Sequence, residues 1–221
     1  MKIRSLTLPT RNLAAQRTFY GQVLGLPVEI GETNSLSVHI GTSRLIFEQG
    51  DGADGFSHIA FDIPRTLLAQ AEDWLRARVP LLADPQGRTV FGPTDSWNTT
   101  NLYFDDPPGN ILEFIARHDQ PHDGSGPFGP RSLPHISELG VVVPDVPQAV
   151  VGLGQRFGLH AFNGQSETFT AVGGHDGMLI VVREGRGWFP VGRPAVPTPF
   201  ELSFADGQGT RFLRHTDLEP R

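Results

Sequence analysis

The 221-residue chain contains no cysteine, which excludes disulfides, thiol catalysis and zinc sites built from thiolates. Basic residues are also few, with 18 Lys and Arg against 24 Asp and Glu, for a formal net charge of −6. Lys2 is the single lysine, and no basic run occurs in the sequence. An electrostatic interaction with nucleic acid or with an anionic membrane is therefore not expected.

Long apolar runs are absent as well. No stretch approaches the roughly 20 residues of a membrane-spanning helix. The first residues, "MKIRSLTLP", begin directly with a strand pattern and lack the apolar centre of a signal peptide. With 38% hydrophobic and 19% charged residues, the composition is typical of a soluble globular protein with a sizeable core. We expect a cytoplasmic protein.

What the sequence does contain is a repeating order of elements: a strand, a helix, and then two or three strands. Residues 4–28 begin with alternating leucines, after which Asn12 can cap a helix that Gly25 ends. Residues 57–79 and 137–159 follow the same order with the same alternation phase. The sequence thus contains three copies of one unit.

Pairs of short strands joined by turns follow each of the three helices, and a fourth copy begins at residues 199–206 but has no complete continuation. Residues 119–134 are rich in Pro, Gly and polar residues and read as a linker. The prediction is a first domain of modules 1–54 and 55–118, followed by an incomplete second domain, residues 135–221.

Two motifs within this repeat, "FYGQVLGL" and "YFDDPPGNILEF", together resemble the vicinal oxygen chelate superfamily. Its members include glyoxalases, fosfomycin and bleomycin resistance proteins, and extradiol dioxygenases. The resemblance covers nearly all of residues 1–118 and is weaker over 135–206. It implies an α+β fold of βαβββ modules. Two modules pair into a cupped mixed sheet around a metal site, and this chain adds a third module and a truncated fourth.

The strand "GFSHIAFDIP", residues 55–64, places a histidine among apolar residues. Ile59, Phe61 and Ile63 share one face and should pack beneath the helix, so His58 should face the opposite side of the sheet. The resemblance implies that this position is a metal ligand.

Glu113 lies in the last strand of the second module, between Ile111 and Ile115 on the face opposite Leu112 and Phe114. Burying a carboxylate there is costly unless it is paired, protonated or bound to a metal. The resemblance implies that Glu113 is a ligand, and an imidazole with a carboxylate on one concave face can form half of a divalent-metal site.

The first module departs from the family pattern of two histidines and one glutamate, because Ser5 matches the position of His58. A serine hydroxyl is a poor ligand for a divalent transition metal. Three alternatives remain open: Glu48, two residues beyond the position aligned with Glu113; His39, on a neighbouring strand; or a ligand from a partner chain. We place Ser5 or Glu48 near an open ligand position, with Glu113 and Glu48 as catalytic candidates.

Glu138 and Glu201 match the position of His58 in the third and fourth copies. A second site would also need a last-strand carboxylate, but Val181 and Val182 stand there. The second half is therefore expected to serve a structural or substrate-covering role, or to bind a cationic group through these acids. Four aromatic residues are expected to line or cover a pocket: Trp97, Tyr103, Trp188 and Phe189.

Two functions follow from the resemblance. The first is a metal-dependent enzyme of the glyoxalase or extradiol dioxygenase type, using Fe, Mn, Ni or Zn on a small substrate with vicinal oxygens. The second is a metal-free small-molecule binding protein of the bleomycin-resistance type, which the serine in place of a ligand favours. Because the truncated fourth module would leave an exposed sheet edge, we also expect a homodimer.

Overall fold

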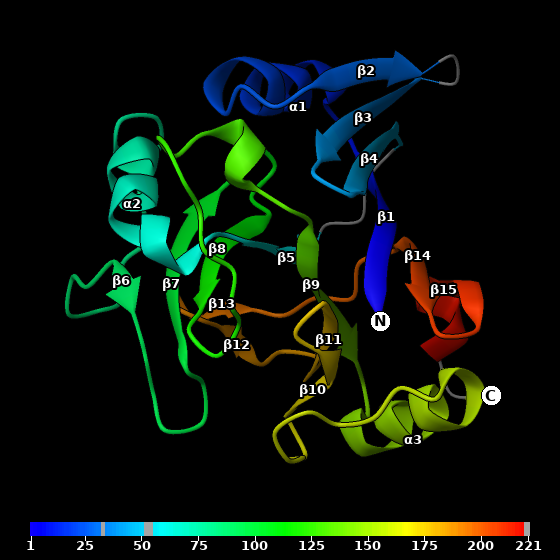
Figure 1. The fold of residues 1–221 in the computed structure, drawn as a ribbon. Helices are drawn as coiled ribbons and strands as arrows, with labels where there is room; N and C mark the ends of the chain where they lie inside the picture. The colour runs from blue at the N-terminus through cyan, green and yellow to red at the C-terminus, as the bar shows by residue number, and fades with distance from the viewer. Residues whose placement is uncertain (32–33, 51–54, 219–221) are drawn as a thin grey trace.

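The computed structural model describes residues 1–31, 34–50 and 55–218, which form two large mixed sheets with three α-helices (Figure 1). The first module comprises β1 (Lys2–Thr10), α1 (Leu13–Thr18) with a π-helical turn (Phe19–Val23), β2 (Val28–Gly31), β3 (Ser35–Ile40) and β4 (Ser43–Gln49). The second comprises β5 (His58–Asp62), a 3-10 turn (Arg65–Leu67), α2 (Leu68–Arg76), β6 (Val90–Phe91), β7 (Thr99–Asp105) and β8 (Ile111–Arg117).

The third module comprises β9 (Ile136–Val143), α3 (Val146–Phe157), β10 (Phe169–Gly174) and β11 (Gly177–Arg183). A short hairpin of β12 (Gly187–Trp188) and β13 (Arg193–Pro194) leads to β14 (Glu201–Asp206), β15 (Gly209–Arg214) and a final 3-10 turn (His215–Leu218). The expected α+β fold of repeated modules is confirmed. The expected linker holds one 3-10 turn (Pro130–Ser132), and its Phe128 and Leu133 are buried, so it packs onto the body of the protein.

The pairing of the modules differs from the expectation that modules 1–54 and 55–118 share one sheet. One sheet has the order β15-β14-β1-β4-β3-β2 and the other β10-β11-β9-β5-β8-β7-β6. The first module therefore pairs with the fourth-module fragment, and the second with the third. Figure 1 shows β1 and β14 side by side, although they lie near opposite ends of the chain.

This pairing has a simple physical reason. The first strand of every module has a free edge that an equivalent strand can pair with, and the alternation pattern is the same in all copies. Residues 118–135, between β8 and β9, are long enough to bring β9 back to the free edge of β5, where it pairs antiparallel. The sequence pattern does not distinguish between these equivalent edges.

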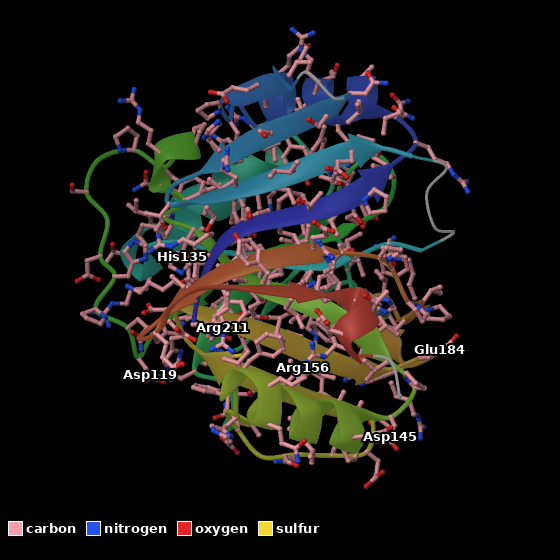
Figure 2. The ribbon with its side chains drawn as sticks, turned by 90° about the vertical axis from the view of Figure 1, so that its right-hand side faces the viewer. Asp119, His135, Asp145, Arg156, Glu184 and Arg211 are labelled. Carbon is pink, nitrogen blue, oxygen red and sulfur yellow. The ribbon has the colours of Figure 1, made fainter. Side chains whose placement is uncertain are left out.

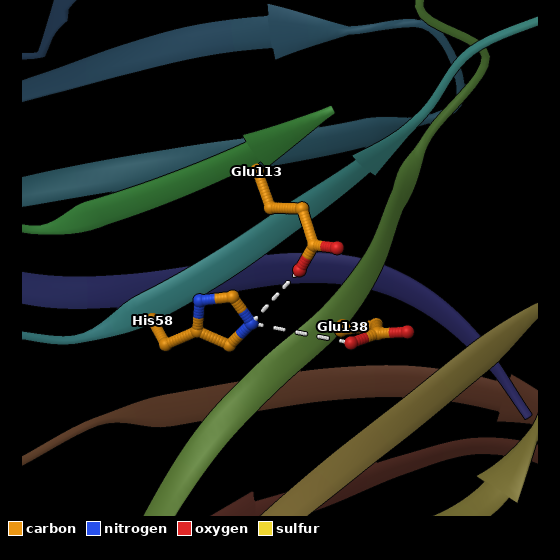
Figure 3. Close-up of side chains that lie close together, drawn as sticks. All are labelled: His58, Glu113 and Glu138. Carbon is orange, nitrogen blue, oxygen red and sulfur yellow. Dashed lines mark ion pairs between the residues drawn. The ribbon is translucent and has the colours of Figure 1, made fainter. Parts of the chain in front are cut away.

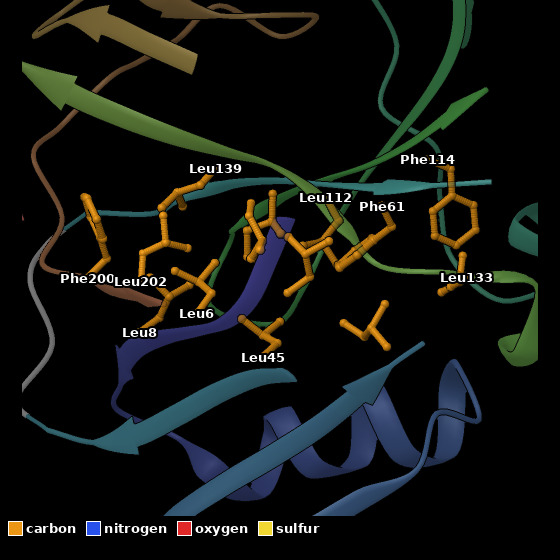
Figure 4. Close-up of a cluster of buried hydrophobic side chains, with 14 of the residues drawn as sticks. Leu6, Leu8, Leu45, Phe61, Leu112, Phe114, Leu133, Leu139, Phe200 and Leu202 are labelled. Atoms are coloured by element: carbon orange, nitrogen blue, oxygen red, sulfur yellow. The ribbon is translucent and has the colours of Figure 1, made fainter. Parts of the chain in front are cut away.

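The main hydrophobic core lies between the two sheets (Figure 4). Leu6, Leu45 and Leu202 from one sheet and Leu112 and Leu139 from the other belong to one buried cluster, and the close-up shows them facing one another. Because side chains alternate along a strand, residues of the opposite phase point to the outer face of each sheet. The inner phase therefore builds the core and leaves the outer faces for other functions.

The predicted caps are present at the start of α1 and at both ends of α3, whereas α1 passes into its π-helical turn after Thr18, before the predicted end at Gly25. Asn12 Oδ1 accepts a hydrogen bond from Ala15 N at 2.9 Å, and Asp145 Oδ1 accepts one from Gln148 N at 2.9 Å. Gly158 ends α3 with a φ of 66°, a conformation that glycine adopts without strain. None of the described helices has the length and apolarity of a membrane span.

The fourth-module fragment is fastened to α3 (Figure 2). Arg211 of β15 donates a hydrogen bond to the backbone oxygen of Arg156 at 2.8 Å, and Arg156 pairs with Asp217 at 2.7 Å. Both guanidinium groups lie over the ring of Phe157. These contacts bind the last strand of one sheet to the helix of the module that belongs to the other.

Candidate metal centre

Three ionisable side chains converge on the outer face of the seven-stranded sheet (Figure 3). They come from three adjacent strands, with His58 on β5, Glu113 on β8 and Glu138 on β9. Ala60 is the register partner of Glu113 on one side and of Glu138 on the other. Two strand pairings therefore place the two carboxylates beside His58.

The distances within this cluster are short. His58 Nε2 lies 3.2 Å from Glu113 Oε2 and 4.0 Å from Glu138 Oε2. One ligand atom from each residue lies within 4.8 Å of the others. The three residues are 5%, 2% and 4% exposed, so the cluster is almost completely shielded from solvent.

Burial and mutual charge shift the protonation of this cluster. Burial lowers the pKa of His58, but the hydrogen bond with Glu113 and the charges of both glutamates outweigh it, so the pKa is raised. Burial, helped by the charge of Glu138, raises the pKa of Glu113 against the opposing effect of His58. The cluster therefore favours a positive charge, either a proton or a cation, among its three side chains.

Arg117, at the end of β8, holds the second oxygen of Glu138. Its Nη2 donates to Glu138 Oε1 at 2.5 Å, and its Nε donates to Asp62 Oδ1 at 3.0 Å. Burial lowers the pKa of Arg117, but the charges of Glu138 and Asp62 outweigh it. Glu113, Glu138 and Asp62 therefore present an excess of acidic groups over the one guanidinium, and burial lowers the pKa of His135, which lies 3.5 Å from Asp62. A divalent cation would neutralise that excess.

The donor set fits such a cation. An imidazole nitrogen and carboxylate oxygens suit Fe, Mn, Ni and Zn, and ligands of one ion lie about 2.0–2.2 Å from it. Within the described part of the chain, Glu113 Oε1 and His58 Nδ1 are buried without a hydrogen-bond partner. Three protein ligands would leave further coordination positions open to a substrate.

A fourth ligand position on this sheet is occupied by an apolar side chain. Gly140 lies two residues after Glu138 and pairs with Ile180, as Ala60 lies two residues after His58 and pairs with Glu113. Ile180 is therefore the equivalent of Glu113, and it lines the same cavity. The sequence-based assignment of Val181 and Val182 to this position is wrong, because Val181 points into the core and Val182 pairs with Val142, two residues further along β9.

A cavity of about 300 Å³ opens beside the three side chains of the cluster. Trp188 of β12 covers it, with its ring centroid 5.2 Å from that of His58, and Tyr103 lies 6.3 Å from His58 on the other side. A Cβ atom on Gly140 would lie 2.6 Å from Trp188 Cη2 and 2.8 Å from His58 Cβ. The absence of a side chain at residue 140 thus lets the indole pack against the imidazole.

Some of the predicted site residues meet in this cavity. His58 and Glu113 are in contact, and the four aromatic residues expected to line or cover a pocket all line it: Trp97, Tyr103, Trp188 and Phe189. The hairpin that carries Trp188 is held in place by Arg193, which pairs with Asp105 and donates to Gly109 O at 3.0 Å.

Ser5, Glu48 and His39 do not lie in this cavity, because they belong to the other sheet. Ser5 Oγ is hydrogen-bonded to Ser203 Oγ at 2.6 Å, and Glu48 is exposed. His39 Nε2 lies 3.3 Å from a carboxylate oxygen of Glu29. The placement of Ser5 or Glu48 near an open ligand position is therefore corrected: it assumed that the first and second modules share a sheet.

Glu138 is the site residue that sequence reasoning did not place here. Its match to the position of His58 was the available signal, but it was assigned to a separate second half of the protein. Placing it beside His58 and Glu113 required knowing that β9 pairs with β5. Its equivalent in the other sheet, Glu201, is exposed and pairs with Arg214 at 3.0 Å.

No protein-family model matches the chain, and no curated protein matches it in sequence. Solved structures do match. A "putative dioxygenase" from Bacillus subtilis is 16% identical over 95% of this chain and 72% of its own, with a TM-score of 0.61. A mutant of glyoxalase I from Zea mays is 14% identical over 98% of this chain and 93% of its own, with a TM-score of 0.56.

The chain has a glyoxalase-like fold. The resemblance to the vicinal oxygen chelate superfamily is thus confirmed at the level of the fold. At these low sequence identities, a shared fold does not identify the substrate or the reaction. Both must be argued from the residues of the site.

Proposed function

We propose that this chain is a metal-dependent enzyme acting on a small substrate with two adjacent oxygens. The observation that carries the proposal is the buried convergence of His58, Glu113 and Glu138 at the floor of a cavity. A divalent cation held there, Fe, Mn, Ni or Zn, supplies Lewis acidity to the substrate oxygens. The surrounding residues would transfer the proton, position the ligands and exclude water.

Each nearby residue has a definable task in this proposal. Glu113 lines the cavity, and burial raises its pKa, which makes its carboxylate a stronger proton acceptor for the substrate. Arg117 donates to one oxygen of Glu138 and leaves the other facing His58. Trp188 and Tyr103 enclose the site and limit the access of water, which strengthens its electrostatic interactions.

The metal-free alternative was favoured by Ser5 in the place of a ligand. Ser5 lies in the six-stranded sheet and is not part of the cavity. Its identity therefore gives no support to the metal-free alternative. The glyoxalase and dioxygenase readings differ in whether the metal must be redox-active, and the donor set suits metals of both kinds.

An activity screen tests the proposal. Protein loaded separately with Mn(II), Fe(II), Ni(II) or Zn(II) is assayed with catechols under oxygen and with the hemithioacetal of methylglyoxal and glutathione. We expect turnover in one series that a chelator abolishes and that Glu113→Gln lowers by at least about 100-fold. Glu48→Gln, on the other sheet, is the matched control and should retain activity. Turnover that survives both the chelator and Glu113→Gln would contradict the proposal.

A further inference from the structure

Arg186 lines the same cavity as the three candidate ligands, and it is the one cationic side chain in the described lining. It lies in the turn between β11 and β12, immediately before the hairpin that carries Trp188. Its guanidinium sits 5.0 Å from the centre of the Phe169 ring, which also lines the cavity. The charged group is thus supported by the aromatic wall of the pocket.

Eight of the described arginines form an ion pair with a carboxylate, and Arg186 is not among them. Arg117, Arg156, Arg193 and Arg214 each pair with a carboxylate. Among the described residues, no carboxylate pairs with Arg186, whose side chain donates one hydrogen bond, from Nη1 to Gly187 O at 3.3 Å. A guanidinium has five donor hydrogens in a planar fork, so most of its capacity is available to a ligand.

The charge of Arg186 lies in surroundings that solvate it poorly. Arg186 is partly buried, and burial lowers its pKa, which shows that solvation of the charged form is incomplete. Around it the cavity wall is largely apolar and aromatic, with side chains contributed by Phe91, Trp97, Phe169, Ile180, Trp188 and Phe189. An anionic group on a bound ligand would restore the solvation that the wall removes.

We propose that the substrate is a small planar aromatic molecule with an anionic group, such as a carboxylate, and that Arg186 binds this group. This inference rests on the proposed function, because the adjacent oxygens of the same molecule would face His58, Glu113 and Glu138. A cavity of about 300 Å³ is at the lower end of the range for small-molecule sites, so one small ligand can reach both features. The aromatic walls favour a flat ligand through stacking.

Ligand binding to metal-loaded protein, followed by fluorescence of the cavity tryptophans, tests the proposal. The probes are catechol, 2,3-dihydroxybenzoate and 3,4-dihydroxybenzoate, which share the adjacent oxygens and differ in the carboxylate. Wild-type protein should bind one of the two carboxylated probes at least about 10-fold more tightly than catechol. Arg186→Gln should abolish that preference, and Arg186→Lys should retain part of it.

Arg183→Gln is the matched control, because Arg183 is an exposed arginine at the end of β11 outside the cavity lining. It should keep the full preference. If Arg186→Gln keeps the preference, or if wild-type protein shows none, the proposal is overturned. Circular dichroism of each variant establishes that the fold is intact.

A second arm separates this inference from the proposed function. Chelator-treated protein is titrated with benzoate and with benzyl alcohol, which cannot chelate a metal through adjacent oxygens. A preference for benzoate that Arg186→Gln removes would support the role of Arg186 even if no metal binds. Metal binding without any preference for the anionic probes would overturn the role of Arg186 and leave the metal centre in place.

Discussion

Arg117 Nη2 lies 2.5 Å from Glu138 Oε1, in an ion pair whose side chains are 2% and 5% exposed. The same guanidinium pairs with Asp62 at 3.0 Å. One buried arginine therefore balances two carboxylates, and one of these belongs to the candidate metal centre. The charge balance of the site and the stability of the sheet depend on the same side chain.

Arg117→Met should destabilise the protein by about 3–5 kcal/mol, because it removes the buried guanidinium that pairs with both Glu138 and Asp62. Urea unfolding measures this change. Arg214→Met is the control: its pair with Glu201 is 66% and 62% exposed, so the loss should be below about 1 kcal/mol. Equal losses in the free energy of unfolding for the two variants would show that the buried ion pairs stabilise the protein no more than the exposed one.

Gly140→Ala should displace Trp188 from His58, because the added Cβ would lie 2.6 Å from the indole. We expect a loss of about 1–3 kcal/mol and a changed tryptophan emission. Gly152→Ala, in α3, meets no atom within 4 Å and should stabilise the protein by up to about 1 kcal/mol. Unchanged emission of Gly140→Ala would contradict the packing of Trp188 described above.

Asp106 should make stability depend on pH. Its carboxylate accepts hydrogen bonds from Gln16, Tyr20 and Asn110, yet burial raises its pKa to about 6. A raised pKa means that the folded state binds the proton more tightly than the unfolded state, so stability falls as pH rises from about 4 to 6. The loss amounts to about 3 kcal/mol, from two pKa units at 1.36 kcal/mol each.

The free energy of unfolding of wild-type protein minus that of Asp106→Asn, measured in urea between pH 4 and 7, isolates this effect. The difference should decrease by up to about 3 kcal/mol over that interval and then remain constant. A difference that does not vary with pH would mean that Asp106 keeps an ordinary pKa in the folded protein.

The expected homodimer stays a prediction. β15 is the last strand of its sheet, and its Phe212 is 73% exposed. An exposed edge with a large apolar side chain is a surface that proteins usually cover. Light scattering at micromolar concentration should give the mass of a dimer, and Phe212→Asp should give that of a monomer. A monomeric mass for the wild-type protein would end this hypothesis.

Alternation within single strands predicted that His58 and Glu113 face away from the apolar side of their strands, and the resemblance to the superfamily implied their role as ligands. Glu138 required knowledge of which strands pair, and this depends on contacts between segments far apart in the chain. The same error placed Ser5 in the site, since a repeated module offers equivalent edges. The module, the orientation of His58 and Glu113 and the aromatic wall could thus be read from local pattern, while the place of Glu138 beside them could not.

Metal stoichiometry tests the central claim most directly. Untagged wild-type protein, His58→Ala, Glu138→Gln and Glu201→Gln are incubated with Mn(II), Fe(II), Ni(II) or Zn(II), freed of excess metal, and measured by elemental analysis. Glu201 is the counterpart of Glu138 in the other sheet, so its variant controls for the loss of a carboxylate. The account predicts about one metal per chain in wild-type protein and Glu201→Gln, and little in the other two. Equal metal content in all four proteins, or none in the wild type, would contradict it.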